Sequence, residues 1–301
     1  MISFIMMAKN EEERIGDAIS SLITQSVYEK WELIIVDDGS TDKTFEVASH
    51  FSLREPRVKV FRNIHLGKVL GTGYGYTLSK GEYIKCIDAD DVLLPEFFYE
   101  FKKAIPFDAH CHSALVTNEK LDPIAFYAVN LSILNSNYNH VVENLLSLPK
   151  WSWTFHRTVA DKLFPIPTDM PIEDVWMSIV IRSSAKQIKF NTKPLYLYRQ
   201  HHGQDYGGIL NFDRDMVVLR ALRSEKIIQV LENEYPELLT SANLDPMKKA
   251  LQLQTCQKSI FTILASGIPA KLMIKVLVML HFPAMAKILT KLKWKHDGFK
   301  I

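Results

Sequence analysis

The sequence predicts an α/β protein built on a doubly wound, mostly parallel sheet, followed by a helical C-terminal extension. Two observations in the first roughly 100 residues favour this fold class. Short apolar segments alternate there with helical patterns, and these segments are almost wholly apolar, as in sheets covered on both faces. In addition, polar clusters directly follow three of the predicted strands, at the carboxyl ends where such sheets bind ligands.

The first predicted strand covers residues 2–7 and leads into Lys9 and Asn10. Asn10 and Glu13 have the spacing of a helix N-terminal capping box. The apolar residues that follow have helical spacing and define one face of a helix: Ile15, Ile19, Leu22 and Ile23. This segment therefore predicts a strand followed by a helix.

A second apolar strand is expected at residues 32–36, directly before Asp37 and Asp38. The turn through Asp42 leads into a helix that extends to about Phe51, and a third strand follows at residues 58–61.

The glycine-rich connection of residues 67–80 is predicted to be helical. Its glycine spacing fits neither a Walker loop nor the dinucleotide fingerprint. We expect Gly71, Gly73 and Gly75 to allow close packing of a helix on the sheet. Lys68 is a candidate contact for phosphate or sugar.

The central stretch is a strand that opens after Gly81 and ends in three carboxylates: Asp88, Asp90 and Asp91. Carboxylates this close repel one another, so the cluster costs stability unless a cation lies there. Oxygen ligands on a loop suit Mg²⁺ or Mn²⁺ that also binds phosphate. The alternative is an acidic turn that caps the next helix at residues 95–96.

Beyond Asp91 the alternation of predicted strands and helices is weaker. A helix is expected at residues 94–104, with strands near 113–117 and 124–131. His110 and His112 would share a strand face, but a zinc site is disfavoured because no second ligand pair is near in sequence. The aromatic residues around Trp151 and Trp153 would either stack on a sugar or belong to the core.

Glu173 and Asp174 follow Pro171 at a predicted helix start. They would either interact with the helix dipole or supply a general base that accepts a proton from a hydroxyl. Strands are expected at residues 187–191 and 195–198. The cationic loop of residues 199–203 would either stabilise a leaving diphosphate or form a solvated turn.

Composition narrows the class of protein. The 301 residues carry a net charge of +2, which argues against a nucleic-acid binder. The three cysteines have no metal-ligand spacing and fit a reducing compartment. No signal peptide is recognised, and the apolar run of residues 268–289 contains lysines and a proline, so a spanning helix is not expected. A cytoplasmic protein is therefore predicted.

The C-terminal region is predicted to be helical at residues 213–233 and 245–265. Near the end, apolar residues have helical spacing beside a stripe of lysines: Met285, Ile288, Leu289 and Leu292, with Lys287, Lys291 and Lys295, and Trp294 among them. Residues 284–295 therefore fit a helix that lies on an anionic membrane. The alternative is a helix packed on the protein with a solvated lysine face.

Taken in order, five motifs resemble those of family 2 glycosyltransferases, inverting enzymes of the GT-A fold that use nucleotide-sugars. The matching stretches are residues 6–12, 35–42, 81–91, 173–174 and 198–201. The resemblance covers roughly residues 1–205 and implies a catalytic domain there, with a nucleotide-binding half at 1–105 and an acceptor half at 106–205. Residues 206–301 would form the helical extension.

The resemblance also implies roles for single residues. Asp38 would accept the N3–H of uracil or thymine. The nucleotide-sugar would be bound by a wider set: Met7, Ala8, Lys9, Asn10, Lys68, Asp88, Ala89, Glu173, Arg199 and His201. Asp90 and Asp88 would hold Mn²⁺ or Mg²⁺. Asp174 would be the catalytic base.

Two departures from the family pattern are visible. Many members carry Ala-Arg-Asn-x-Gly where residues 71–75 read Gly-Thr-Gly-Tyr-Gly, so an Arg and an Asn contact are absent. Many members also have Pro at the position of Ala8. These departures leave the identity of the donor sugar open.

The leading hypothesis is transfer of a sugar, from UDP in particular, to a glycan or lipid-linked glycan in lipopolysaccharide, capsule or other surface polysaccharide synthesis. Such an enzyme would be peripheral on the cytoplasmic face of the inner membrane. A catalytically silent nucleotide-sugar-binding scaffold is the alternative. A nucleotidyltransferase is disfavoured, because residues 8–11 do not form a glycine-rich basic loop.

Overall fold

The computed structural model describes residues 1–25, 30–64, 67–201, 213–239 and 242–296. It divides into two compact units. The first unit comprises residues 1–129, 148–168 and 180–201, and the second comprises residues 130–147, 169–179 and 202–301. The predicted boundary at residue 205 stays a prediction beside this division, in which two segments from the first 205 residues belong to the second unit.

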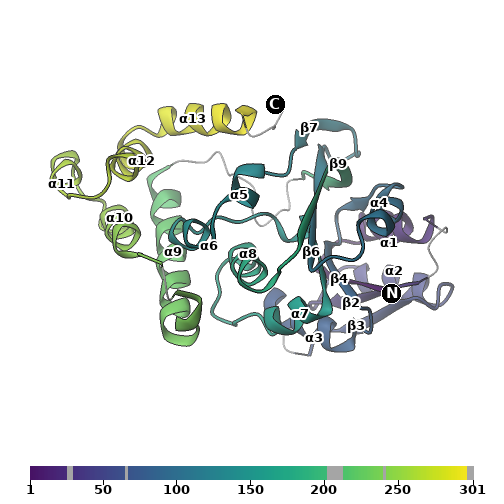
Figure 1. The fold of residues 1–301 in the computed structure, drawn as a ribbon. Helices are drawn as coiled ribbons and strands as arrows, with labels where there is room; N and C mark the ends of the chain where they lie inside the picture. Colours follow the sequence, from purple (N-terminus) through teal and green to yellow (C-terminus); the bar gives the residue numbers. More distant parts are fainter. Residues whose placement is uncertain (26–29, 65–66, 202–212, 240–241, 297–301) are drawn as a thin grey trace. The chain divides into compact units, whose positions relative to one another are not determined.

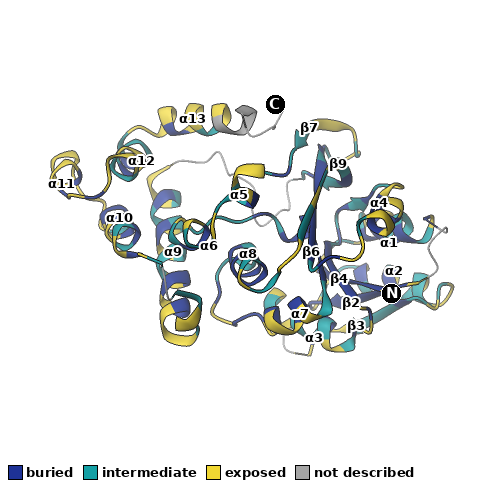
Figure 2. Ribbon diagram, in the orientation of Figure 1, coloured by how far each residue is buried: buried dark blue, intermediate teal, exposed yellow. Residues whose placement is uncertain are grey.

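The first unit contains a mixed sheet (Figure 1). The strand order is β3-β2-β1-β4-β8-β6-β9-β5, with β7 paired to β6. Its first half is parallel and is formed by β1 (Ile2–Ala8), β2 (Trp31–Asp37), β3 (Val58–Arg62) and β4 (Tyr83–Asp88). Strands β1 and β2 are buried along their whole length, as their apolar sequences predict (Figure 2). The predicted doubly wound α/β architecture is confirmed for this half.

Helices cover both faces of the parallel half. Helices α1 (Ile15–Ile23), α2 (Thr44–Ser52) and α4 (Phe97–Ala104) contribute to one core together with alternate residues of β1 and β2. Helix α3 (Lys68–Leu78) covers the opposite face, where Tyr74 and Leu78 pack near Met7 and Val36.

Two of the three glycines in α3 explain how closely it approaches the sheet. A Cβ added at Gly75 would lie 2.7 Å from Cγ2 of Ile5, and one at Gly71 would lie 2.3 Å from Cε of Met7. A Cβ at Gly73 would meet no atom within 4 Å. The packing role predicted from the sequence is therefore confirmed for Gly71 and Gly75 and wrong for Gly73.

The second half of the sheet is mixed. Strand β8 (Trp153–His156) runs antiparallel to both β4 and β6 (Ala109–Thr117), and β6 runs parallel to β9 (Ile188–Arg199). Short strand β5 (Val92–Leu93) and strand β7 (Pro123–Tyr127) add antiparallel pairs. The two strands predicted at 187–191 and 195–198 form one continuous strand, β9. Pro194 lies within this strand, opposite Ser113, where the register shifts.

The predicted cap of the first helix is also wrong. Helix α1 begins at Ile15 after Arg14, and Asn10 has a φ of 55°. The Asn10 side chain instead accepts a hydrogen bond from the backbone N–H of Thr41, 2.9 Å away. Asn10 thus joins two loops rather than starting a helix.

Further helices accompany the second half of the sheet and the second unit: α5 (Leu131–Asn135), α6 (Tyr138–Glu143), η1 (Lys150–Ser152), α7 (Arg157–Leu163), α8 (Glu173–Ser184) and η2 (Pro236–Leu239). The C-terminal helices are α9 (Arg214–Glu234), α10 (Asp245–Thr255), α11 (Ile260–Leu264), α12 (Ala270–His281) and α13 (Pro283–His296). The single helix predicted at 245–265 is thus divided between α10 and α11. No described helix combines the length and apolar character needed to cross a bilayer.

Candidate functional site

Three loops meet at one edge of the parallel half-sheet, because their strands end side by side. Ala8 is paired in register with Asp37, and Met7 is paired with Asp88. The loop that follows β1, the Asp37–Asp38 turn and the Asp88–Asp91 loop therefore start from adjacent positions. This is the arrangement predicted from the polar clusters at the strand ends.

Backbone donors join the loop after β1 to the loop after β2. The N–H of Asn10 donates to Oγ of Ser40 at 3.0 Å, and the N–H of Glu11 donates to Oγ1 of Thr44 at 2.7 Å. In return, Glu12 accepts from the N–H of Lys43 at 2.9 Å. These bonds hold Glu11 at a defined place beside the strand ends.

Asp38 is buried, and one of its oxygens is already occupied. Its Oδ1 accepts from Nδ2 of Asn63 at 2.7 Å and from the N–H of Gly67 at 2.6 Å. Its Oδ2 lies 4.0 Å from Nζ of Lys9, too far for a hydrogen bond. The carboxylate is therefore held in place through one oxygen, and the other is oriented as an acceptor.

Met7, Ala8 and Ala89 are nearly buried, with exposed fractions of 9%, 2% and 3%. Their side chains belong to the core of the first unit. Any contact that they make with a ligand would therefore involve their backbone.

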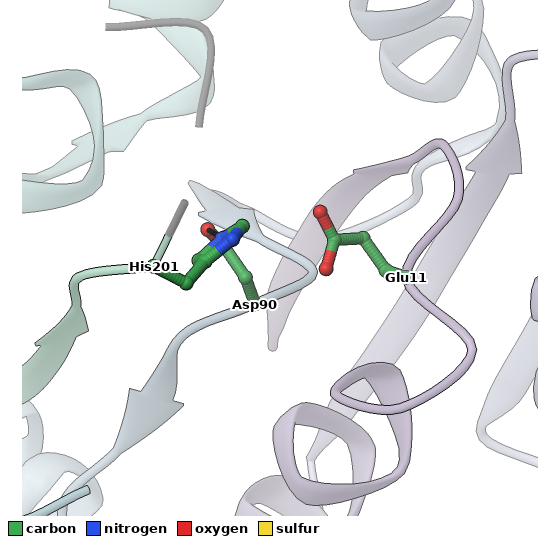
Figure 3. Close-up of side chains that lie close together, drawn as sticks. All are labelled: Glu11, Asp90 and His201. Carbon is green, nitrogen blue, oxygen red and sulfur yellow. Dashed lines mark hydrogen bonds and ion pairs between the residues drawn. The ribbon is translucent and has the colours of Figure 1, made fainter. Parts of the chain in front are cut away.

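Glu11, Asp90 and His201 form a cluster of metal-ligand type. One ligand atom from each residue lies within 4.8 Å of the others. Figure 3 shows the two carboxylates and the imidazole ring turned toward one another, from the loops after β1 and β4 and from the end of β9. Nε2 of His201 lies 3.0 Å from Oδ2 of Asp90.

Burial and neighbouring carboxylates disfavour negative charge on two acids at this edge of the sheet, Glu11 and Asp91. Burial, and then the charge of Asp90, raise the pKa of Glu11. Burial, together with Asp90 and Asp88, raises the pKa of Asp91 well above its ordinary value. Two carboxylates and an imidazole suit a divalent ion such as Mn²⁺ that also accepts phosphate oxygens. The residues present therefore fit a metal.

Glu11 was not predicted as a site residue. Its position two residues after a Lys at a strand end was the available signal, but in the sequence it is one of three consecutive glutamates, Glu11–Glu13. Only its place beside Asp90 and His201 in the folded chain distinguishes it from its neighbours.

The end of β9 places His201 against the Asp88–Asp91 loop. The N–H of Arg199 donates to Oδ1 of Asp91 at 2.8 Å, and the N–H of Gln200 donates to the carbonyl of Thr117 at 2.9 Å. The Arg199 side chain is buried and pairs with Asp17 at 2.8 Å. Arg199 thus fixes the loop in this structure, and its predicted contact with a diphosphate stays a prediction.

Asp88 pairs with two lysines. Nζ of Lys150 lies 3.0 Å from its Oδ1, and Nζ of Lys68 lies 3.8 Å from the same atom. Burial alone would raise the pKa of Asp88, but the ammonium groups of Lys150 and Lys68 lower it below its ordinary value. Asp88 is not part of the Glu11–Asp90–His201 cluster among the described residues.

Lys150 was also not predicted, although it precedes the aromatic segment noted in the sequence. That segment belongs to the core: Trp151 and Trp153 are 4% and 1% exposed, and Trp151 stacks on Tyr196 with 5.2 Å between ring centroids. A lysine beside buried tryptophans was the signal that could have identified it.

Glu173 and Asp174 occupy the first turn of α8, as predicted, and belong to the second unit. Both residues are half-buried. The role of Asp174 as a base stays a prediction.

Part of the chain matches a known protein family. Residues 3–144 match the model described as glycosyl transferase family 2. An uncharacterized glycosyltransferase of Haemophilus influenzae is 36% identical over 98 residues, which cover 32% of this chain and 30% of that protein. Poly-beta-1,6-N-acetyl-D-glucosamine synthase of Staphylococcus epidermidis is 35% identical over 92 residues, covering 31% and 22% respectively. The chain thus matches about a third or less of these relatives' lengths.

Solved structures resemble the chain over most of its length. The S. aureus TarS 1–349 structure in complex with UDP-GlcNAc has a TM-score of 0.56 at 17% identity, covering 95% of this chain and 88% of that one. The mannosyltransferase PcManGT from Pyrobaculum calidifontis, in complex with GDP-Man and Mn²⁺, has a TM-score of 0.58 at 15% identity, covering 95% and 83%. These similarities show that the fold is GT-A.

Proposed function

Because residues 3–144 of this chain match the model of glycosyl transferase family 2, we propose that the protein is a metal-dependent, inverting glycosyltransferase. Its donor is a nucleotide-sugar, in particular a UDP-sugar, and its acceptor is a hydroxyl group of a glycan or glycolipid. The observation that carries this proposal is the Glu11–Asp90–His201 cluster at the same strand edge as Asp38 and Asp88.

The donor site is formed by the loops at that edge. Oδ2 of Asp38 accepts the N3–H of the pyrimidine base, because Oδ1 already has its partners. Lys9 and Asn10 flank the nucleoside, and Asp88 faces the ribose. Lys68, which is half-exposed, contacts the diphosphate. UDP-GlcNAc and GDP-Man in the two similar structures support a nucleotide-sugar of this type.

Glu11, Asp90 and His201 hold the divalent ion, and the Mn²⁺ in the similar mannosyltransferase supports this assignment. When bound, the ion neutralises charge on the departing diphosphate. The imidazole and the two carboxylates set its position, while Arg199 keeps the His201 segment attached to the Asp88–Asp91 loop.

Asp174 takes the proton of the acceptor hydroxyl as that oxygen attacks the anomeric carbon from the face opposite the leaving diphosphate. The new glycosidic bond forms as the bond to the diphosphate breaks, so the configuration inverts. Replacing Asp174 with Asn should lower transfer by roughly 10²- to 10⁴-fold, the usual contribution of a general base. UDP affinity should stay unchanged, which calorimetry would check.

We propose surface polysaccharide, such as lipopolysaccharide or capsule, as the destination of the sugar. The match to a poly-N-acetylglucosamine synthase supports polysaccharide synthesis as the process. A lipid-linked acceptor would bring the enzyme to the cytoplasmic face of the inner membrane, where the exposed apolar side chains of α13 would contact lipid.

The test is a donor screen. Purified protein is incubated with Mn²⁺ and a panel of UDP-, dTDP- and GDP-sugars, and released nucleoside diphosphate is measured with and without EDTA. Slow release from one UDP-sugar that EDTA abolishes is the expected result. Release that is insensitive to EDTA would contradict the metal role of Asp90.

The alternative function is a silent nucleotide-sugar-binding scaffold, which the glycines at 71–75 favour because they replace the Arg and Asn of many relatives. Calorimetry with UDP and activity with candidate acceptors distinguish the two functions. UDP binding without transfer to any lipid-linked or free glycan would favour the scaffold.

A further inference from the structure

Lys85 is a fully buried lysine in the middle of β4 that the proposed reaction does not use. Its Nζ has three acceptors: Nε2 of His112 at 2.8 Å, the carbonyl of Trp151 at 2.5 Å and the carbonyl of Trp153 at 3.4 Å. A buried lysine without partners would be costly, so these bonds explain how the core tolerates it.

The bonds of His112 define which atom donates. Its Nδ1 lies 2.9 Å from the carbonyl of Ser113, which can only accept, so Nδ1 carries the proton. For a neutral ring, Nε2 is then the acceptor, and Lys85 donates to it. Lys85 therefore directs its donors to His112 and to the segment of Trp151 and Trp153.

That segment carries Lys150, whose side chain is only 6% exposed. Lys150 lies in the 3₁₀ turn η1, directly before Trp151. The hydrogen bond from Lys85 to the carbonyl of Trp151 therefore helps to hold this turn in place. Trp151 also stacks on Tyr196, whose hydroxyl accepts from the N–H of Asp88 at 3.1 Å. Lys150 thus reaches Asp88 from a turn that these contacts hold in place, and its ammonium group lies 3.0 Å from Oδ1.

We propose that Lys85 and Lys150 are positioning residues that present Asp88 to the nucleotide as a hydrogen-bond acceptor. This inference rests on the proposed function. Lys150 occupies Oδ1 of Asp88, so Oδ2 is the oxygen available to a ribose hydroxyl. Lys68 is half-exposed and lies 3.8 Å from Oδ1, beyond hydrogen-bond distance, so it can turn to the diphosphate without leaving Asp88 unpaired.

The assignment gives Asp88 and Asp90 different roles. Asp90 lies with Glu11 and His201, whereas Asp88 lies with lysines. The ammonium group of Lys150 lies 3.0 Å from Oδ1 of Asp88, and its positive charge repels a cation that approaches the same carboxylate. Loss of Lys150 should therefore weaken nucleotide binding and leave Mn²⁺ binding intact.

The experiment measures UDP affinity by calorimetry at saturating Mn²⁺, and Mn²⁺ affinity separately, for the full chain. Lys150→Met should weaken UDP binding roughly tenfold, about the worth of a hydrogen bond to a charged group. Lys150→Arg should retain part of the UDP affinity that Lys150→Met loses. Lys59→Met is the matched control, because Lys59 pairs with Glu32 at 2.7 Å elsewhere in the sheet.

A double-mutant cycle separates positioning from a merely structural role. If Lys150 acts through Asp88, the losses of UDP affinity in Lys150→Met and Asp88→Asn should not add in the double variant. The double variant also removes both charges of the pair, so it should fold even where Lys150→Met alone does not. Lys85→Met should weaken UDP binding in the same non-additive way.

Wild-type UDP affinity in Lys150→Met, or fully additive losses in the cycle, would overturn the inference alone. A loss of Mn²⁺ affinity in Lys150→Met, absent in the Lys59→Met control, would do the same. Failure of the wild-type protein to bind UDP would overturn the proposed function and this inference with it.

Discussion

At the scale of single residues, the cluster of Glu11, Asp90 and His201 allows a sharp test of metal binding, because Asp88 provides a control carboxylate two residues away. Asp90→Asn should lower transfer roughly 100-fold or more, since a metal ion contributes several kcal/mol to the transition state. His201→Asn should act in the same way.

Electron paramagnetic resonance of free Mn²⁺ measures the binding directly. Asp88→Asn should bind Mn²⁺ as the wild type does, because its oxygen pairs with Lys150 and Lys68. Equal loss of Mn²⁺ binding in Asp88→Asn and Asp90→Asn would contradict the division between the two acids.

Lys85 gives a prediction about pH and stability. Burial lowers the pKa of Lys85 to about 7, whereas the pKa in the unfolded chain is about 10.4. Above pH 7 the unfolded chain therefore holds a proton that the folded chain releases, and the free energy of unfolding should rise with pH by up to about 1.4 kcal/mol per pH unit.

This increase should be visible between about pH 7 and pH 8.5. At higher pH the buried Cys111 acts in the opposite direction, because burial raises its pKa and only the unfolded chain ionises near pH 8.5. Urea unfolding at several pH values tests the effect. The Lys85→Met variant should lack the rise, and a wild-type profile parallel to that of the variant would contradict the prediction.

At the scale of elements, α3 contains its own control for packing against the sheet. Gly75→Ala should lower the free energy of unfolding by about 1–3 kcal/mol, because the new methyl group would lie 2.7 Å from the branched side chain of Ile5. Gly73→Ala should raise it by about 0.5–1 kcal/mol, since that site is open and alanine favours helices. Equal effects in urea unfolding would mean that α3 is not held close to β1.

The helices and strands also differ in whether the sequence predicts them. The strands β1, β2 and β4 could be predicted, since an apolar run bounded by polar turn residues has few alternative structures. Strand β5 could not, because its two residues are a strand only through pairing with Tyr196 and Leu197. The start of α1 was also wrong, because Asn10 forms a bond to Thr41, distant in sequence, that local capping rules do not include.

The residues of the candidate site also divide into those that the sequence predicts and those that it does not. Asp38, Asp88 and Asp90 follow predicted strands, so their common edge could be predicted from topology. Glu11 and Lys150 could not, because they reach the site through bonds between loops and through a buried lysine. The pattern of apolar and polar residues shows where strands end. The positions of side chains from other segments depend on tertiary packing, which this pattern does not show.

At the scale of the whole molecule, net positive charge and exposed apolar side chains occur together in the C-terminal region. From Pro246 to His296 the sequence has nine lysines and no aspartate or glutamate. The apolar stripe predicted on α13 is exposed, since Met285, Ile288, Leu289 and Leu292 are each about half accessible or more, whereas Ala286 is buried. Figure 2 draws most of the described part of α13 as exposed. The side chains of Trp294 and Lys295 lie outside the described residues.

Helix α11 also carries an exposed aromatic side chain, because Phe261 is 84% exposed. Exposed aliphatic and aromatic side chains beside lysines suit an anionic bilayer better than a nucleic acid. We therefore expect the protein to sediment with vesicles containing phosphatidylglycerol and not with phosphatidylcholine alone. The bound fraction should fall as salt rises, since each lysine near the surface contributes about 1 kcal/mol of screened attraction.

Two variants separate lipid contact from simple charge attraction. Replacing Ile288 and Leu292 with Ser should abolish vesicle binding even at low salt, whereas replacing Lys287 and Lys291 with Gln should weaken it and reduce its salt dependence. Neither change should alter UDP affinity if the donor site lies in the first unit. Persistent vesicle binding in the Ile288 and Leu292 variant would exclude α13 as the lipid contact, and concentration-dependent dimers lost in that variant would assign the apolar stripe to a second copy of the chain.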